Sequence, residues 1–219
     1  MAVVDDGSQT RDTFHLAYPA LDVVATFASV EALLAARPVT DLIVLDLLLS
    51  TTLGDPGILQ GPKAIIELVR QGYRVSLYTD ERRLLVLAHC LSAGASGLVR
   101  KSDSLAHNQE AFLRLASGET VVPPSLVGLA ELLSRRNRLP ELTERQIEVL
   151  SARARGETWE ALSRRLHISP KTAYDRLEAV MAKMVWYLGE AGLEPDASPA
   201  DIERALGLAP GDLNEHAAN

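Results

Sequence analysis

The sequence predicts two domains: a doubly wound α/β domain with a parallel sheet of five strands, followed by an all-α domain that contains a helix-turn-helix. In the first half of the chain, short apolar segments alternate with segments whose apolar residues recur every three or four positions, a pattern typical of alternating strands and helices. In the second half, Thr, Ser and Pro mark the starts of successive helices. The length of 219 residues suits two domains of ordinary size.

Five strands are expected where the chain is almost continuously apolar, because strands of a parallel sheet are buried on both faces. They are predicted at residues 3–4, 23–25, 42–45, 75–78 and 97–99. Amphipathic helices are expected around them at residues 7–18, 30–36, 63–71, 81–93 and 104–117. Asp5 and Asp6 follow the first strand and Asp46 follows the third. Since functional groups of such sheets collect at the carboxyl ends of the strands, this edge is where chemistry is expected.

The pattern changes after Gly118. Pro123 and Pro124 end the preceding element, a short apolar helix is expected at 125–134, and residues 135–140 have the composition of an exposed linker. We therefore predict an α/β domain at 1–120, a linker with a short helix at 121–140, a helix-turn-helix domain at 141–186 and an acidic C-terminal extension at 187–219.

The helix-turn-helix is predicted from its start and stop signals. Thr143 with Gln146 forms a capping box, and Gly156 ends the helix that follows. A second helix is expected at 158–166. Ser169 and Pro170 then supply the N-cap and first position of a longer third helix that reaches Met184 or beyond. One more helix is expected at 199–208.

Composition excludes several classes of protein. No apolar segment approaches the roughly 20 residues that span a bilayer, and the first residues lack the features of a secretory signal, so we expect a cytoplasmic protein without membrane contact. Cys90 is the only cysteine, which leaves no intrachain disulfide or thiolate metal cluster.

The net charge of −7 argues at first against nucleic-acid binding. The acidity is concentrated in the tail, however. Residues 141–186 contain eight basic and seven acidic side chains, whereas residues 187–219 contain one and seven. The near-neutral segment therefore predicts modest, salt-sensitive DNA affinity that depends on dimerisation.

Residues 142–150, Gly156 and residues 168–172 resemble the LuxR-type (NarL-like) DNA-binding domain at the family's spacing, over about 141–184. The resemblance implies that the third helix enters the major groove of promoter DNA. Arg176 suits a bidentate contact to guanine and Lys171 a phosphate contact. The DNA-binding residues implied are Lys171, Thr172, Tyr174, Asp175 and Arg176. The family often has lysine at the position of Tyr174 and histidine at that of Arg176. A helical protein-binding module without DNA affinity is the alternative for this domain.

Five residues of the first half follow predicted strands: Asp5, Asp6, Asp46, Thr79 and Lys101. With the segment 94–101, they resemble the receiver domain of two-component response regulators over residues 1–120. The resemblance implies that Asp46 accepts a phosphoryl group from a sensor histidine kinase. It also implies that Asp5, Asp6 and Asp46 hold Mg²⁺, and that Thr79 and Lys101 support the phosphoryl group.

Three departures from the receiver pattern leave an alternative open. Asp80 stands where the family has a small residue, Leu98 where it has a switch aromatic, and the path from Asp46 to Gly61 is about seven residues longer than usual, which predicts a loop overhanging the pocket. These favour an atypical receiver controlled by a ligand, a partner or dimerisation, with the same DNA-binding output.

An enzyme is the least favoured reading. A phosphotransferase or phosphatase would use Asp46 as its nucleophile, but phosphatases of the dehalogenase type need a second aspartate two residues on, where this chain has Leu48. The sequence therefore predicts a homodimeric response-regulator transcription factor that is not an enzyme.

Overall fold

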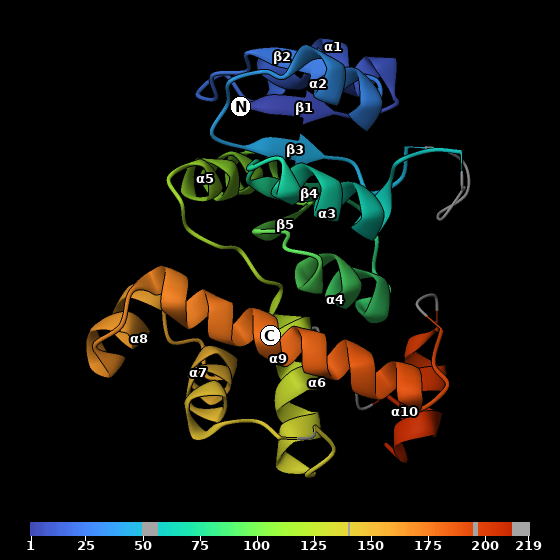
Figure 1. The fold of residues 1–219 in the computed structure, drawn as a ribbon, viewed down its shortest axis with the longest axis vertical. Helices are drawn as coiled ribbons and strands as arrows, with labels where there is room; N and C mark the ends of the chain where they lie inside the picture. Colours follow the sequence, from blue (N-terminus) through green and yellow to red (C-terminus); the bar gives the residue numbers. More distant parts are fainter. Residues whose placement is uncertain (50–56, 140, 195–196, 212–219) are drawn as a thin grey trace. The chain divides into compact units, whose positions relative to one another are not determined.

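The computed structural model describes residues 1–49, 57–139, 141–194 and 197–211, which divide into two compact units (Figure 1). The first unit comprises Met1–Glu81 and Ala93–Val121, and the second comprises Arg82–Ser92 and Val122–Asn219. The chain thus leaves the first unit after Glu81, returns at Ala93 and leaves again after Val121. The domain boundaries expected from the sequence stay a prediction.

A parallel sheet of five strands organises the first unit. The strands are β1 (Ala2–Val4), β2 (Ala25–Phe27), β3 (Ile43–Leu45), β4 (Val75–Thr79) and β5 (Gly97–Arg100), in the spatial order β2-β1-β3-β4-β5. Val4 pairs with Phe27 on one side and Leu45 on the other. This order confirms the doubly wound fold.

The second strand begins two residues later than expected. Val24 donates its amide to the Met1 carbonyl, and pairing with β1 starts at Ala25 opposite Ala2. Val23 packs instead against the apolar core of the unit. Val23 therefore serves packing, whereas Val24 is exposed and the strand itself is partly exposed.

Four helices connect the strands of this unit or follow them: α1 (Ser8–Ala17), α2 (Val30–Ala36), α3 (Gly61–Arg70) and α5 (Leu105–Ala116). Ser29 and Ser104 cap α2 and α5 through their hydroxyl oxygens, and Pro62 occupies the first turn of α3. Since crossovers between parallel strands are right-handed, this strand order places α1 on one face of the sheet and α2 and α3 on the other. Phe112 of α5 packs against Phe14 of α1, so α5 lies on the same face as α1.

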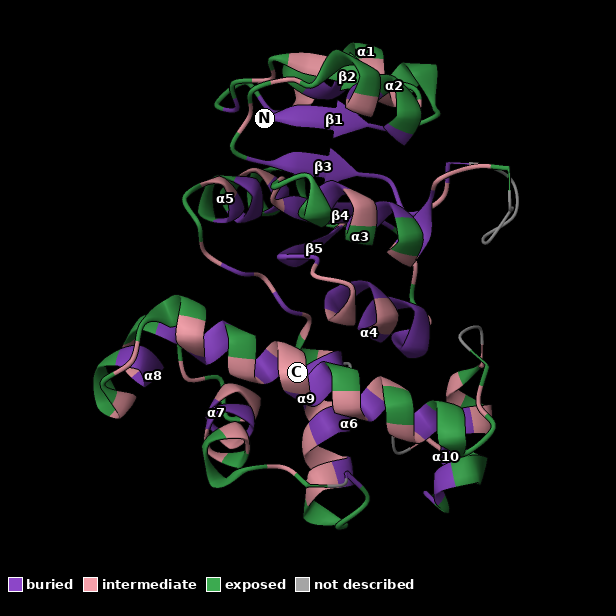
Figure 2. Cartoon of the chain, viewed as in Figure 1, coloured by how far each residue is buried: buried purple, intermediate pink, exposed green. Residues whose placement is uncertain are grey.

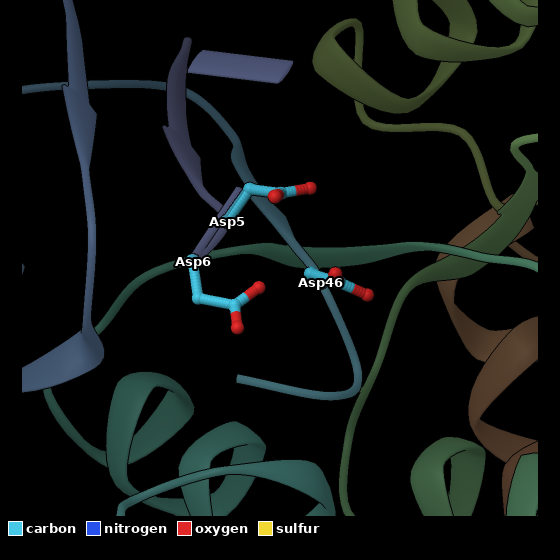
Figure 3. Close-up of side chains that lie close together, drawn as sticks. All are labelled: Asp5, Asp6 and Asp46. Atoms are coloured by element: carbon cyan, nitrogen blue, oxygen red, sulfur yellow. The ribbon is translucent and has the colours of Figure 1, made fainter. Parts of the chain in front are cut away.

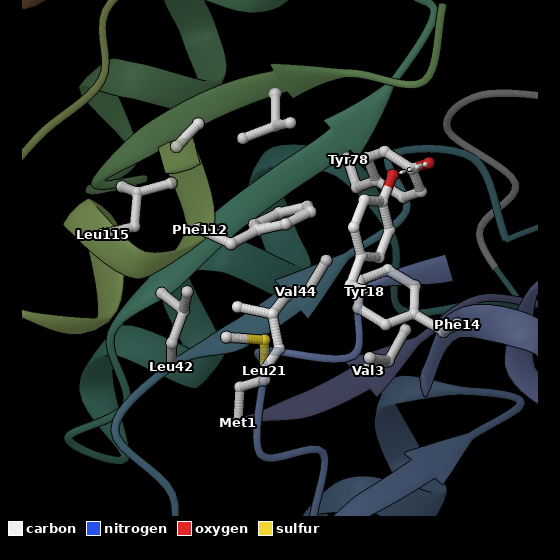
Figure 4. Packing of buried hydrophobic residues seen from close by; sticks show 12 residues of the cluster. Met1, Val3, Phe14, Tyr18, Leu21, Leu42, Val44, Tyr78, Phe112 and Leu115 are labelled. Carbon is white, nitrogen blue, oxygen red and sulfur yellow. Dashed lines mark hydrogen bonds between the residues drawn. The ribbon is translucent and has the colours of Figure 1, made fainter. Parts of the chain in front are cut away.

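An aromatic cluster joins α1 and α5 to the sheet (Figure 4). Phe14 and Tyr18 from α1 and its C-cap, Phe112 from α5 and Tyr78 from β4 lie with ring centroids 4.7 to 6.3 Å apart. Each ring is buried, which stabilises the fold by roughly 1.5–3 kcal/mol per side chain. This core holds the β4 and β5 ends in place beside α1.

The second unit is helical. Its helices are α4 (Leu84–Ser92), α6 (Pro124–Arg135), α7 (Glu144–Ala154), α8 (Trp159–Leu166), α9 (Pro170–Glu190) and α10 (Pro199–Leu206). The expected capping box of Thr143 and Gln146 is present, and Thr158 and Ser169 cap α8 and α9. Helices α7, α8 and α9 form the predicted helix-turn-helix, and α9 runs six residues past Met184. None of the helices that the structure describes is both long and apolar enough to cross a membrane.

Helix α4 groups with the helical unit although it lies between two strands in the sequence. It packs mainly against α9 and also against α6. Leu84, Leu85, Val86, Leu87, Ala88, Cys90 and Leu91 are all buried (Figure 2). Because apolar residues occur on all sides of α4, this helix lacks the polar, solvent-exposed side of an ordinary amphipathic helix. The chain therefore runs from β4 directly into the core of the helical unit.

Candidate functional site: an acidic pocket and a helix-turn-helix

Three carboxylates gather at the carboxyl ends of β1 and β3 (Figure 3). The Asp46 amide donates to the Val4 carbonyl at 2.8 Å, which sets the end of β3 beside that of β1. One oxygen from each of Asp5, Asp6 and Asp46 lies within 4.8 Å of the others. Asp5 and Asp46 are buried and Asp6 is exposed. The structure thus brings together all three predicted acidic residues.

Lys101 reaches this cluster from the end of β5. Its Nζ donates to Asp5 Oδ2 at 2.9 Å and to Asp46 Oδ2 at 2.8 Å. Its main-chain amide donates to the Thr79 carbonyl, which ties the ends of β4 and β5 together. One ammonium therefore bridges two buried carboxylates that come from different strands.

The burial of the pocket changes its acid–base properties. Burial raises the pKa of Asp46 above its ordinary value, and the nearby charge of Asp5 adds to this, while Lys101 offsets part of the rise. Burial by itself would lower the pKa of Lys101, but its hydrogen bonds and charge interactions with Asp46 and Asp5 outweigh that effect and raise it. The pocket therefore favours a cation beside Asp46.

The donor set suits a hard divalent cation. Mg²⁺ prefers carboxylate oxygens and retains waters, and the site offers three carboxylates of which Asp6 opens to solvent. Lys101 donates hydrogen bonds to one carboxylate oxygen of Asp5 and one of Asp46, while Asp5 Oδ1 accepts from the Gly7 amide at 2.8 Å. The cluster is thus compatible with a Mg²⁺ site.

Two residues that the sequence analysis did not single out shape the loop after β1. Arg11 Nη1 donates to the carbonyls of Asp5 and Asp6, both at 2.7 Å. A Cβ at Gly7 would lie 2.9 Å from Asp5 Oδ1, so a side chain there would displace the carboxylate. A basic residue five positions after an acidic pair, in the helix that follows it, was the available signal for Arg11.

Thr79 and Asp80 follow β4. Thr79 is buried, and its Oγ1 accepts from the Glu81 amide at 3.1 Å. Asp80 Oδ1 accepts from the Ser102 amide at 2.8 Å, so its carboxylate is held by the turn after β5. Asp80 is absent from the three-carboxylate cluster among the described residues. The added acidic residue is therefore accommodated by capping a turn.

Two other departures from the receiver pattern are Leu98 and the long segment after Asp46. Leu98 is buried in β5, so no aromatic side chain occupies the position of the family's switch residue. Most of the predicted overhanging loop, residues 50–56, lies outside the described residues.

The first turns of α9 carry the predicted DNA-binding residues. Ser169 Oγ accepts from the Thr172 amide at 3.0 Å and caps the helix. Lys171 Nζ donates to both carboxylate oxygens of Asp175 at 2.9 Å, in an exposed i, i+4 pair. Lys171, Thr172 and Asp175 therefore share the accessible side of this helix.

Two of the predicted DNA-binding residues are less accessible. Tyr174, expected at the DNA, is only 8% exposed, and its ring lies edge-on to Trp159 of α8 with centroids 6.1 Å apart. Tyr174 shares the buried side of α9 with Ala173 and Leu177, so it packs the helix-turn-helix together. Arg176 is partly buried, and its Nη1 has no hydrogen-bond partner within the described part of the chain.

Several arginines of the helix-turn-helix are used within the fold. Arg165 pairs with Glu157 at 2.8 Å, and the Arg153 guanidinium lies 4.4 Å from the Trp159 ring centroid. Glu178 in α9 is partly buried, and this burial together with the charge of Asp175 raises its pKa. Arg165 and Arg153 therefore make contacts within the domain.

Comparisons with known proteins agree with this architecture. No protein-family model matches the chain. It is 27% identical over 180 residues to the transcriptional regulatory protein LnrK of Bacillus subtilis, covering 75% of this chain and 79% of that protein. It is 31% identical over 114 residues to the transcriptional regulatory protein NarL of Mycobacterium tuberculosis, about half of each chain.

Solved structures of RcsB share the fold. The response regulator RcsB of Salmonella typhimurium matches with a TM-score of 0.50 and 20% identity over 94% of this chain and 97% of that one. A complex of the two-component response regulator RcsB with DNA matches with a TM-score of 0.52 and 19% identity over 94% and 96%. A five-stranded α/β fold followed by a helical fold with a helix-turn-helix is therefore common to both proteins.

Proposed function

We propose that this chain, a response regulator with a NarL-like helix-turn-helix domain, is a transcription factor whose binding to promoter DNA is controlled by phosphorylation of Asp46. The proposal makes it a cytoplasmic regulator without a metabolic activity of its own. The observation that carries it is the ammonium of Lys101 between Asp46 and Asp5, at 2.8 and 2.9 Å.

Asp46 is the proposed phosphoacceptor because one of its oxygens is available for attack. Oδ2 accepts from Lys101, whereas Oδ1 receives only a long hydrogen bond of 3.4 Å from the Leu48 amide. In transfer from a sensor histidine kinase, Oδ1 forms the new P–O bond, and the P–N bond of the phosphohistidine breaks with its electron pair leaving on nitrogen. When bound by Asp5, Asp6 and Asp46, Mg²⁺ offsets the negative charge that gathers on the phosphoryl oxygens.

Lys101 and Thr79 are the proposed supports of the phosphoryl group. The Lys101 ammonium already contacts Asp46, so a small movement lets it pair with a phosphoryl oxygen. The Thr79 hydroxyl accepts from the Glu81 amide and keeps its own hydrogen for donation. Asp80 stays clear of this role because the Ser102 amide holds its carboxylate.

The first turns of α9 are the proposed DNA-reading surface. Lys171 suits phosphate, and Thr172 and Asp175 share the exposed side of the helix. Arg176 Nη1 is buried and lacks a partner among the described residues, and a guanine edge would satisfy its guanidinium after a change of rotamer. Tyr174 is assigned to packing. A homodimer is proposed because one near-neutral domain binds DNA weakly, and the RcsB structures include dimers bound to DNA.

The connection from Thr79 to α4 is the proposed route of control. Only four residues separate the end of β4 from α4, and α4 packs against α9 within the helical unit. A change at Thr79 on phosphorylation, which adds about 1.5–2 negative charges, would thus reach a helix that contacts α9. The atypical receiver is not favoured by the similarity to response regulators.

Phosphorylation is tested with acetyl phosphate and Mg²⁺, followed by intact mass measurement. Wild type and the exposed control Asp41→Asn should each gain one phosphoryl group, whereas Asp46→Asn should gain none. Absence of the adduct from wild type, with both acetyl phosphate and a panel of histidine kinases, would leave the atypical receiver as the better account.

A further inference from the structure

We propose that a cavity beside the acidic pocket binds a small uncharged ring compound with a carbonyl group. The cavity has a volume of about 180 Å³ and lies within the first unit, between α1 and the end of β4. At roughly 30 Å³ for each water, it holds about six waters or a single-ring molecule. This ligand site is separate from phosphorylation and does not depend on it.

The walls of the cavity favour a flat ring. Phe14, Tyr18 and Tyr78 line it, and all three are buried members of the aromatic cluster (Figure 4). Aromatic side chains in such clusters prefer edge-to-face or offset contacts, which a planar guest continues. Thr10 and Gln9 of α1 form a polar rim.

One hydroxyl hydrogen beside the cavity has no acceptor among the described residues. The Tyr18 and Tyr78 hydroxyls are 2.8 Å apart, so one donates to the other (Figure 4). The Asn108 side-chain amide also donates toward the Tyr18 oxygen, at 3.4 Å. Since each hydroxyl has one hydrogen, the pair retains one O–H without an acceptor among the interactions of the described residues. A guest therefore has to supply an acceptor.

Lys101 adds a second donor. Its ammonium has three N–H groups, of which two are directed to Asp5 and Asp46. Nζ lies 5.5 Å from the centroid of the Tyr78 ring, and Lys101 lines the cavity. The third N–H is thus available on the side where the guest would lie.

The charge of the neighbourhood selects an uncharged acceptor. Three carboxylates lie within 4.8 Å of one another behind a single ammonium, so an anionic guest would meet net repulsion. A cationic guest would instead meet Lys101 and the unpaired hydroxyl hydrogen. A neutral carbonyl accepts from both donors without adding charge.

Occupancy of the cavity would act on the acidic pocket through Lys101. A carbonyl that accepts from the third N–H shares the Lys101 ammonium with Asp46 and Asp5, so it fixes the position of the group that bridges these two carboxylates. By thermodynamic linkage, any effect of the guest on Mg²⁺ binding is matched by an equal effect of Mg²⁺ on the guest. The cavity is therefore a second input to the first unit.

The test is a titration of the full chain, free of Mg²⁺, with acetophenone, monitored by amide chemical shifts in NMR spectra. Acetophenone should bind saturably, whereas benzoate of the same size and toluene without an acceptor should each bind at least about fivefold more weakly. The double variant Tyr18→Phe with Tyr78→Phe, which removes both hydroxyls and with them the unpaired O–H, should weaken acetophenone by a similar factor.

Two variants that fill the cavity locate the site. Ala17→Phe and Thr13→Phe each add a ring at a position that lines the cavity and should abolish saturable binding of acetophenone. If Ala17→Phe fails to fold, Thr13→Phe provides the same test. Leu16→Phe, on the exposed side of the same helix, should bind as wild type. The proposal is overturned if acetophenone does not saturate up to about 10 mM, if benzoate or toluene binds as tightly, or if a folded cavity-filling variant binds unchanged.

Discussion

Lys101 Nζ lies 2.8 Å from Asp46 Oδ2, and the same atom lies 2.9 Å from Asp5 Oδ2. A single ammonium thus substitutes for part of the positive charge that a divalent cation and a phosphoryl-binding group would contribute. Both carboxylates are buried, and the Lys101 side chain is about one quarter exposed. The resting stability of the site and the proposed phosphorylation of Asp46 therefore depend on the same contacts.

Replacing Asp46 should make stability less sensitive to pH. Because the folded-state pKa of Asp46 is raised, ionising it disfavours the fold, and this loss develops as pH rises from the ordinary carboxyl value of about 4 through the raised value. Asp46→Asn lacks that loss. Urea unfolding should show that the free energy of unfolding of the variant, relative to that of wild type, is larger at pH 7 than at pH 4.

The comparison isolates Asp46 because Lys101 stays protonated at both pH values, since its pKa is raised from an already high one. The control Asp41→Asn, at an exposed position before β3, should show no such pH-dependent difference. An equal offset of Asp46→Asn at both pH values would contradict the raised pKa.

Removing the Lys101 ammonium should lower the free energy of unfolding. Lys101→Met leaves Asp5 and Asp46 facing each other without a cation, and breaking a buried pair of this kind costs on the order of 3–5 kcal/mol. Chemical denaturation of Lys101→Met should show this loss, and Mg²⁺ should recover much of it by replacing the missing charge. Lys63→Met, at an exposed position in α3, should change stability by less than about 0.5 kcal/mol.

Mg²⁺ should stabilise the wild-type protein. A ligand present at 100 times its dissociation constant raises the free energy of unfolding by about 2.7 kcal/mol, so saturating Mg²⁺ should raise the melting temperature and chelation should reverse the rise. Asp6→Asn should reduce this response without disturbing the Lys101 pairs, because the ion pairs of Lys101 among the described residues are with Asp5 and Asp46. Asp12→Asn, exposed on α1, is the matched control; an equal response in both variants would remove Asp6 from the site.

The two basic residues at the start of α9 should affect DNA binding differently. Arg176→Ala should cost about 1–3 kcal/mol at one base pair and relax specificity there. Lys171→Ala should weaken binding to all sequences and reduce the salt slope by about one. Fluorescence anisotropy against promoter DNA at several salt concentrations measures both effects, with Arg204→Ala in α10 as the control. If neither variant differs from this control, α9 does not read DNA as proposed.

The elements themselves could be predicted because their signals are local. Apolar periodicity, the Thr143–Gln146 capping box and the Ser169–Pro170 helix start act over a few neighbouring residues, and the structure confirms these helices. The strand-end positions of Asp5, Asp46, Thr79 and Lys101 followed from the same patterns, because parallel strands end at a common edge.

Other features depend on partners far along the chain. Asp80 caps Ser102, Tyr18 meets Tyr78 and Tyr174 packs on Trp159, and none of these pairs is marked by local spacing. The same holds for α4, whose apolar sequence predicted a buried helix but left open that it packs on α9. Apolar periodicity and helix capping specify which residues form an element and which of its sides is apolar. The neighbour that covers each side is determined by long-range packing and by the pairing of buried polar groups.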